Sequence, residues 1–196
     1  MTSKLNNFIF SIDNLLGKYR KRLKRENALS KFKSVGKNFD FDPYSTFIRH
    51  HTIAIGENVY IGPNSYISSE GVCIKNNVMI GPGLIIQGND HIYNQVGMLM
   101  KQIKEKVCKE VNIDDDVWIG ARVTILKGVT IREGSVIGTG SVVTRSIPPY
   151  TIAVGIPCKP LKKRFSDSEL LKHLTTIGRS EVEILKIIIE RNLYFK

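Results

Sequence analysis

The stretch IDDDVWIGARVTILKGVTIREGSVIGTGSVV, residues 113–143, carries an aliphatic side chain at every sixth position. The members of this series are Ile113, Ile119, Ile125, Ile131, Ile137 and Val143. A second series lies two positions before the later members: Val117, Val123, Val129, Ser135 and Ser141. A period of six fits neither the 3.6-residue period of an α-helix nor the alternation of a simple strand.

The same period occurs upstream, with one extra residue in the middle of the series. Its members are Ile55, Ile61, Ile67, Ile74, Ile80 and Ile86. A coil explains the period if each hexad forms one short strand and one corner, so that three hexads close a triangular turn. Gly, Asn and Asp suit the corners because they tolerate a positive φ. The sequence therefore predicts a mainly β solenoid over residues 35–165, with Val35, Phe41 and Ile48 in an irregular first turn and helices capping both ends.

The excess positive charge is concentrated outside the repeat. The chain of 196 residues has 29 Lys and Arg against 18 Asp and Glu, a net charge of +11. Residues 1–34 contribute nine minus two, or +7; residues 35–164 contribute fifteen minus eleven, or +4; residues 165–196 contribute five minus five, or zero. A nucleic-acid or anionic-surface partner must therefore be considered.

Residues 1–34 form a basic amphipathic segment, with a helix predicted over residues 5–32. One stripe of this helix is apolar: Phe8, Ile12, Leu15, Leu16, Tyr19 and Leu23. Its second half is basic: Lys18, Arg20, Lys21, Arg22, Lys24 and Arg25. Two interpretations remain open. The stripe packs on the main domain, or it lies on an anionic membrane surface.

Residues 166–196 are predicted to be helical as well. Ser166 and Glu169 form a capping box, and a second helix begins after Gly178. These helices are expected to serve packing and oligomer contacts.

Several classes of protein are disfavoured. Cys73, Cys108 and Cys158 are far apart and odd in number, which indicates a reducing compartment and neither a disulfide framework nor a zinc site. No apolar run is long enough to span a membrane, so we expect a cytoplasmic protein. A basic nucleic-acid-binding or scaffold protein is the non-enzymatic alternative, but no aromatic-interleaved basic surface supports it, and we expect no nucleic-acid partner.

Two stretches, DDVWIGARVTIL (115–126) and GSVVTRSIPPYTIAVGIPCKP (140–160), closely resemble the hexapeptide-repeat acyltransferases. Within that family the chain looks most like sugar O-acetyltransferases of the maltose/galactoside and surface-polysaccharide branches. The resemblance implies a left-handed parallel β-helix, an exception to the right-handed crossover rule. It also implies homotrimers with acetyl-CoA bound between adjacent subunits, acting on saccharides in surface polysaccharide or glycoconjugate synthesis.

His91 ends the upstream repeat, in the sequence IIQGNDHIYN. Transfer of an acetyl group to a hydroxyl needs a base, and an imidazole titrates near neutrality. The resemblance gives His91 this catalytic role, with Asn89 or Asp90 as candidates to orient the ring. Residues 92–112 must leave the coil, and the resemblance implies that this loop covers the acceptor; a solvated hairpin is the alternative. The loop lacks the acidic, proline-rich stretch of the maltose/galactoside branch, which leaves the acceptor undefined.

The resemblance also implies a set of coenzyme contacts. The amide of Ala121 contacts the reacting carbonyl, Thr139, Thr144 and Arg145 contact the pantetheine, and Lys159 and Lys162 bind phosphate. Lysine replaces the family's usual arginine at the last two positions, so the bidentate geometry is lost. Trp118 has two interpretations, a residue near the active-site tunnel or a hydrophobic plug.

The other histidines and other chemistries carry less weight. His50 and His51 lie in the irregular first turn, as corner residues or acceptor contacts, and His173 is expected on a helix surface. A zinc enzyme on this fold needs three converging histidines, which the chain does not offer, so no metal is expected. The alternative enzyme is an N-acetyltransferase of a nucleotide-linked amino sugar, because the same base serves an amine.

Overall fold

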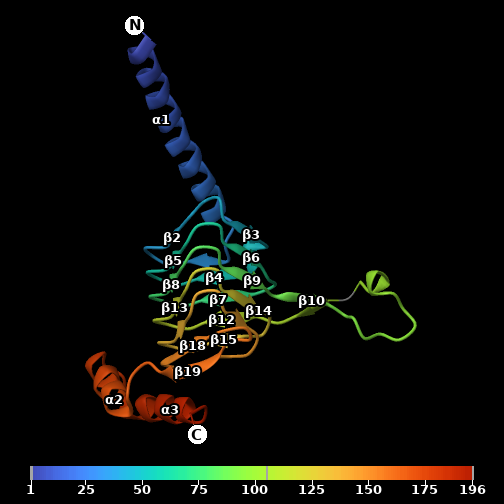
Figure 1. Ribbon diagram of the computed structural model, residues 1–196, viewed down its shortest axis with the longest axis vertical. Helices are drawn as coiled ribbons and strands as arrows, with labels where there is room; N and C mark the ends of the chain where they lie inside the picture. The colour runs from blue at the N-terminus through green and yellow to red at the C-terminus, as the bar shows by residue number, and fades with distance from the viewer. Residues whose placement is uncertain (1, 105, 196) are drawn as a thin grey trace.

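The computed structural model describes the backbone of residues 2–104 and 106–195. Side chains are described for the same residues except 2–9, 12, 89, 106 and 107. The chain forms a β-solenoid, with one long helix leaving its N-terminal end and two short helices covering its C-terminal end (Figure 1). The predicted mainly β, left-handed parallel β-helix with terminal helices is confirmed.

Short strands stack into three sheets, which form the three sides of the coil. Sheet A contains β1 (Ser34–Val35), β4 (Ile53–Ile55), β7 (Val72–Ile74), β12 (Val111–Ile113) and β15 (Thr130–Ile131). Sheet B contains β2 (Asp40–Phe41), β5 (Tyr60–Ile61), β8 (Met79–Ile80), β13 (Trp118–Ile119), β16 (Val136–Ile137), β18 (Thr151–Val154) and the antiparallel β19 (Lys159–Lys163). Sheet C contains β3 (Thr46–Ile48), β6 (Tyr66–Ser68), β9 (Ile85–Gln87), β14 (Thr124–Leu126) and β17 (Val142–Val143). The chain runs from A to B to C in successive strands, which defines three corners named here AB, BC and CA.

The aliphatic hexad series forms the core, as predicted. Strand pairing places Ile80, Ile119 and Ile137 in one column of sheet B, each at most 1% exposed. Corresponding columns fill sheets A and C. The buried serines of the second series donate their hydroxyls to backbone carbonyls, Ser135 to Pro148 O at 2.7 Å and Ser141 to Gly138 O at 2.7 Å. The period of six therefore reports side chains that stack between coils.

The corners use residues that accept unusual backbone geometry. At corner AB, Asn38, Asn58 and Asn77 all have φ between 54° and 57° and hydrogen-bond to one another in a ladder, at 2.8 and 3.1 Å. At corner BC, a Cβ on Gly120 would lie 2.7 Å from the backbone nitrogen of Thr139. Successive coils approach too closely there for a side chain.

The first coil is irregular, as predicted. Phe41 is buried, but Val35 and Ile48 are 37% and 41% exposed. The interior is filled instead by aromatic rings, with Phe32 lying 5.9 Å from Phe39 and 5.1 Å from Phe47 between ring centroids. An end coil has no aliphatic layer above it, and large rings cover the open end of the core.

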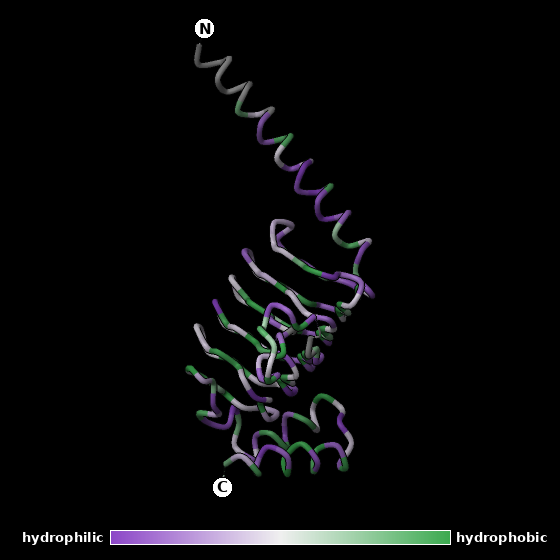
Figure 2. Tube along the Cα trace, turned by 90° about the vertical axis from the view of Figure 1, so that its right-hand side faces the viewer, coloured by the Kyte–Doolittle hydropathy of each residue, from purple (hydrophilic) through white to green (hydrophobic). Residues whose placement is uncertain are grey.

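The N-terminal helix α1 (Thr2–Leu29) extends beyond the first coil and is attached by its last turns (Figures 1 and 2). Arg25 donates to Asp40 at 2.7 Å and to the carbonyl of Phe39 at 2.5 Å. Lys24 lies 4.2 Å from the centroid of the Tyr44 ring. These contacts fix which side of α1 faces the solenoid.

The apolar stripe of α1 faces away from the solenoid. At 3.6 residues per turn, Lys21, Lys24 and Arg25 cover an arc of about 100° on the side opposite the stripe. The described stripe residues are all exposed, by 46% to 68%: Leu15, Leu16, Tyr19 and Leu23. For these residues the interpretation that the stripe packs on the main domain is wrong, whereas the side chains of Phe8 and Ile12 lie outside those described.

The C-terminal helices α2 (Asp167–Thr176) and α3 (Glu181–Asn192) both begin with capping boxes. The predicted box of Ser166 and Glu169 is confirmed, and Ser180 with Glu183 forms a second one. Leu170, Leu174 and Ile184 pack with Tyr150 in a small separate core. His173 is not the expected surface residue, because its ring is half-buried, 5.1 Å from that of Phe165 and 5.7 Å from that of Tyr150.

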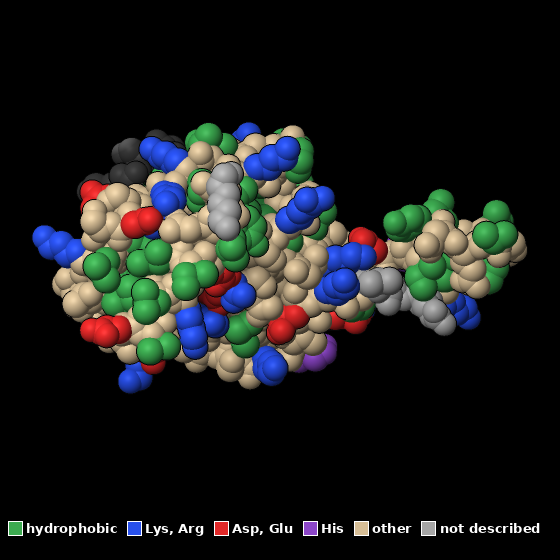
Figure 3. Space-filling view, turned by 90° about the horizontal axis from the view of Figure 1, so that it is seen from below, with side chains coloured by type: hydrophobic (Ala, Val, Ile, Leu, Met, Phe, Trp, Pro, Cys, Tyr) green, Lys and Arg blue, Asp and Glu red, His purple; other side chains and the backbone are tan. Residues whose placement is uncertain are grey.

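An arm leaves the solenoid at corner CA, after β9. It begins as an antiparallel pair, β10 (Asn89–His91) with β11 (Lys106–Cys108), and contains the short 3₁₀ helix η2 (Met100–Gln102). A second 3₁₀ helix, η1 (His50–Thr52), occupies the same corner in the first coil. Residues 111 and 112, expected in the extruded loop, belong to β12. Hydrophobic side chains gather at the far end of the arm (Figure 3). Within the arm, Tyr93, Val96 and Leu99 are 72% to 98% exposed.

Candidate active site

His91 lies at the base of the arm, as the last residue of β10 and directly opposite Lys106. Its side chain is exposed at corner CA. The neighbouring carboxylate of Asp90 forms an ion pair with Lys127, which follows β14 in the next coil. This ion pair joins the arm to the solenoid. The side chain of Asn89 lies outside those described.

Three of the residues predicted to bind coenzyme line one cavity. Thr144 and Arg145 follow β17 at corner CA, and Lys159 begins β19. They share a pocket of about 590 Å³ with Ser146, Ile147, Pro157, Cys158, Pro160 and Tyr194. Burial raises the pKa of the Cys158 thiol, so this cysteine is held protonated and is a poor nucleophile at neutral pH.

The pocket and His91 lie along the same corner. Sheet C pairs β9 with β14 and β14 with β17, so the strand before His91 and the strand before Thr144 are two steps apart. Two strand spacings amount to about 10 Å along the solenoid. Corner CA therefore carries an exposed imidazole at one level and a cationic pocket further along.

The other predicted coenzyme residues lie elsewhere. Ala121 and Thr139 occupy corner BC in adjacent coils, where Gly140 N donates to Ala121 O at 2.9 Å. Lys162 is exposed on β19, opposite Ile152. Within one chain the six residues form a pocket group at corner CA, a pair at corner BC and a single lysine.

The basic run 159–164 is only partly available to phosphates. Lys163 pairs with Asp167 at 3.0 Å, and Arg164 pairs with Asp116 at 2.8 Å. Asp116 lies 48 positions before Arg164 and in another coil. Both pairs hold the chain where it passes from the solenoid to the C-terminal helices.

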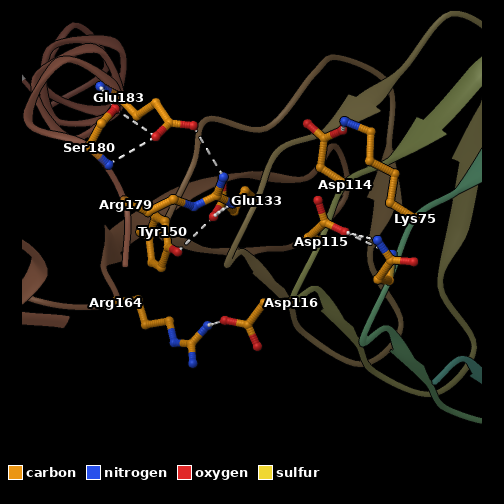
Figure 4. Close-up of polar contacts among 11 residues, drawn as sticks. Lys75, Asp114, Asp115, Asp116, Glu133, Tyr150, Arg164, Arg179, Ser180 and Glu183 are labelled. Carbon is orange, nitrogen blue, oxygen red and sulfur yellow. Dashed lines mark hydrogen bonds and ion pairs between the residues drawn. The ribbon is translucent and has the colours of Figure 1, made fainter. Parts of the chain in front are cut away.

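A second cavity, of about 530 Å³, lies at corner AB beneath those helices (Figure 4). Its charged side chains are mutually engaged: Arg179 binds Glu133 at 2.6 Å, and the Tyr150 hydroxyl donates to the same carboxylate at 3.1 Å. Burial, reinforced by Glu133, raises the pKa of Tyr150. This network joins α2 and α3 to the solenoid.

The remaining candidates are on outer surfaces or outer turns. Trp118 is 53% exposed on the outer face of sheet B, in register with Met79 and Val136, so it is not a core plug. His50 and His51 belong to η1 at corner CA. Burial lowers the pKa of His50, and the positive charge of nearby Lys31 lowers it further. No group of three or more His, Cys, Asp or Glu among the described residues is arranged to hold a metal ion.

Tyr194 was missed by the sequence reasoning. It lines the coenzyme-type pocket from the end of the C-terminal appendage, outside every recognisable motif. Only the packing of α3 brings it there.

Comparison with known proteins agrees with this architecture. Residues 110–145 match the bacterial transferase hexapeptide (six repeats) family, and residues 52–87 match the hexapeptide repeat of succinyl-transferase. The galactoside O-acetyltransferase of Escherichia coli (strain K12) is 35% identical over 142 residues, 71% of this chain and 68% of that protein. Including this one, the matches to four curated relatives span between 55% and 68% of the relatives' own length.

Solved structures lead to the same family. A maltose O-acetyltransferase from Clostridium difficile 630 superposes with a TM-score of 0.66 at 32% identity, covering 74% of this chain and 84% of that one. A galactoside acetyltransferase in complex with coenzyme A gives 0.62 at 31% identity, covering 74% and 72%. The chain belongs to the hexapeptide-repeat acyltransferase family. It falls in the sugar O-acetyltransferase branch, which confirms that it is an enzyme, an acetyltransferase.

Proposed function

We propose that this protein transfers an acetyl group from acetyl-CoA to a hydroxyl of a saccharide, with His91 as the general base. The observation that carries the proposal is the arrangement at corner CA, where an exposed imidazole lies about 10 Å along the solenoid from a cationic pocket. The relatives named for galactoside and maltose acetylation, one of them bound to coenzyme A, support the donor and the acceptor class.

The chemistry needs one proton transfer and one tetrahedral intermediate. His91 removes the proton of the acceptor hydroxyl as its oxygen attacks the thioester carbon. The C–S bond then breaks, the acetyl ester forms, and the proton passes from the imidazolium to the departing thiolate. The backbone amide of Ala121 stabilises the oxyanion, as the resemblance implies.

The site is completed by a second subunit. Ala121 and Thr139 lie at corner BC, across sheet C from His91, so one chain presents two halves on different edges. Exposed Tyr60, Met79 and Trp118 form an apolar column on sheet B that suits an interface. In a homotrimer, corner BC of one subunit adjoins corner CA of the next.

Mixing two inactive variants tests that assembly. His91→Ala removes the base from one half-site, and Thr139→Trp blocks the other. If the site lies between subunits, each active interface needs an intact corner CA from one chain and an intact corner BC from its neighbour. Each condition is met by half of the chains in a co-refolded equal mixture, so the mixture regains about a quarter of the wild-type activity. Mixtures that stay inactive would place the whole site within one chain.

α1 gives the enzyme a location at the anionic inner face of a membrane, near a lipid-linked saccharide. Its exposed stripe faces away from the solenoid, and Lys18 and Arg20 flank it in a segment of +7 net charge. An amphipathic helix of this kind binds anionic headgroups while its apolar side enters the interface. None of the described helices is long and apolar enough to cross the bilayer.

Thiol release from acetyl-CoA across a panel of sugars, including lipid-linked saccharides, tests the activity. Release that depends on a hydroxyl acceptor supports the proposal, and recovery of an acetyl ester identifies the position. Release with an amino sugar alone would favour N-acetylation of a nucleotide-linked amino sugar. No release with any acceptor would refute acetyl transfer.

A further inference from the structure

Tyr194 lies beyond the repeat and beyond the residues matched to the family, yet it forms one wall of the pocket that contains Arg145 and Lys159. Tyr194 is 53% exposed, so it is accessible to a ligand in the pocket. Tyr194 follows α3, which packs beneath the last coil (Figure 1). The C-terminal appendage thus contributes an aromatic surface to a site built by the solenoid.

The position of Tyr194 is fixed by its neighbours in the chain. Arg191 is fully buried and donates to the carbonyl of Phe165 at 2.8 Å, while its guanidinium also binds Asp167. Asn192 donates to the second oxygen of Asp167 at 3.1 Å. Tyr194 N then donates to Arg191 O at 3.2 Å. The last turn is therefore anchored to the junction between the solenoid and α2.

The lining of the pocket selects a class of ligand. Two cations, Arg145 and Lys159, face it, and no carboxylate is among the described lining residues. Pro157 and Pro160 add apolar walls beside the ring of Tyr194. The phosphates of a nucleotide suit the two cations and its flat aromatic base suits the ring of Tyr194, so the nucleotide end of the coenzyme matches this side of the pocket.

We propose that Tyr194 stacks on the adenine ring of the coenzyme and is a specificity residue for nucleotide-bearing acyl donors. The inference rests on the proposed function, because it deepens the donor side of the same site. This position agrees with the direction in which acetyl-CoA would lie along corner CA. With the thioester at His91, the nucleotide end extends toward the pocket, which is two strand spacings away, about 10 Å.

Calorimetry on the full-length protein with coenzyme A and with adenosine 3′,5′-bisphosphate separates nucleotide binding from catalysis. Stacking of a base on one aromatic ring predicts that Tyr194→Ala weakens the binding of both ligands by about 5- to 150-fold. Tyr194→Phe keeps the ring and should bind like the wild type. Leu193→Ala, at an adjacent residue that is 60% exposed and outside the pocket lining, is the matched control.

Acetyl-pantetheine, which lacks the nucleotide, gives a second readout. Its kcat/KM should be the same in Tyr194→Ala and wild type, whereas kcat/KM for acetyl-CoA falls through KM. Two results would overturn the stacking role alone. One is that Tyr194→Ala binds coenzyme A and the bisphosphate as tightly as the wild type does. The other is that its kcat/KM falls as much with acetyl-pantetheine as with acetyl-CoA. A wild-type protein that binds neither coenzyme A nor the bisphosphate would overturn the proposed function and this inference with it.

Discussion

Replacing Leu15 and Leu16 by glutamine tests whether the outward stripe of α1 binds a membrane. Their side chains are 68% and 46% exposed, so together they offer about one complete leucine for burial in the bilayer interface. Full burial of a leucine is worth about 1.5–3 kcal/mol. The double variant should therefore bind vesicles about 10- to 150-fold more weakly.

The assay is co-sedimentation with vesicles of phosphatidylcholine containing phosphatidylglycerol, over a range of lipid concentrations. Val182→Gln with Leu185→Gln is the control, because these α3 side chains are 62% and 59% exposed and carry no basic flank of this kind. Wild-type binding should also fall when salt is raised from about 0.05 M to 0.5 M, since the basic residues are then screened. Equal sedimentation of wild type and the α1 double variant would refute the membrane interpretation of the stripe.

Two further predictions concern stability. Ile119→Ala should lower the free energy of unfolding by about 2–5 kcal/mol in a urea titration. The coils above and below hold Ile80 and Ile137 at fixed spacing, so the cavity left by the substitution cannot close. A loss below about 1 kcal/mol would contradict the stacked core. Hydrogen bonds from Lys163 and then Asn192 lower the pKa of Asp167, so this group stabilises the fold above its unfolded pKa and the contribution disappears as pH falls through the folded value. Unfolding free energies measured between about pH 6 and pH 2 should fall more for wild type than for Asp167→Asn, and parallel curves would contradict the pairing.

The solenoid could be predicted because its signal is local and repeated. The position of a residue within its own hexad is enough to predict whether its side chain is buried. The six members of the series from Ile113 to Val143 are all buried, as the period requires. The first coil broke the pattern at Val35 and Ile48 because it has one neighbour instead of two. There, the covering of an open end decides which side chains are buried.

The candidate site was predictable only in part. The break in the repeat located His91, and the motif around Arg145 located the pocket. Arg164 forms an ion pair with Asp116, and Tyr194 of the C-terminal appendage lines the pocket. Both features depend on contacts between segments far apart in the sequence. No local pattern encodes such contacts.

The most direct test of the central claim is the turnover of His91→Ala with acetyl-CoA and the saccharide that the wild type accepts. His91 is exposed and outside the core, so the variant should fold and bind coenzyme A as the wild type does. Loss of the general base should lower kcat by about 10²–10⁴-fold. An unchanged kcat in a folded variant that binds coenzyme A normally would contradict the assignment of His91 as the base.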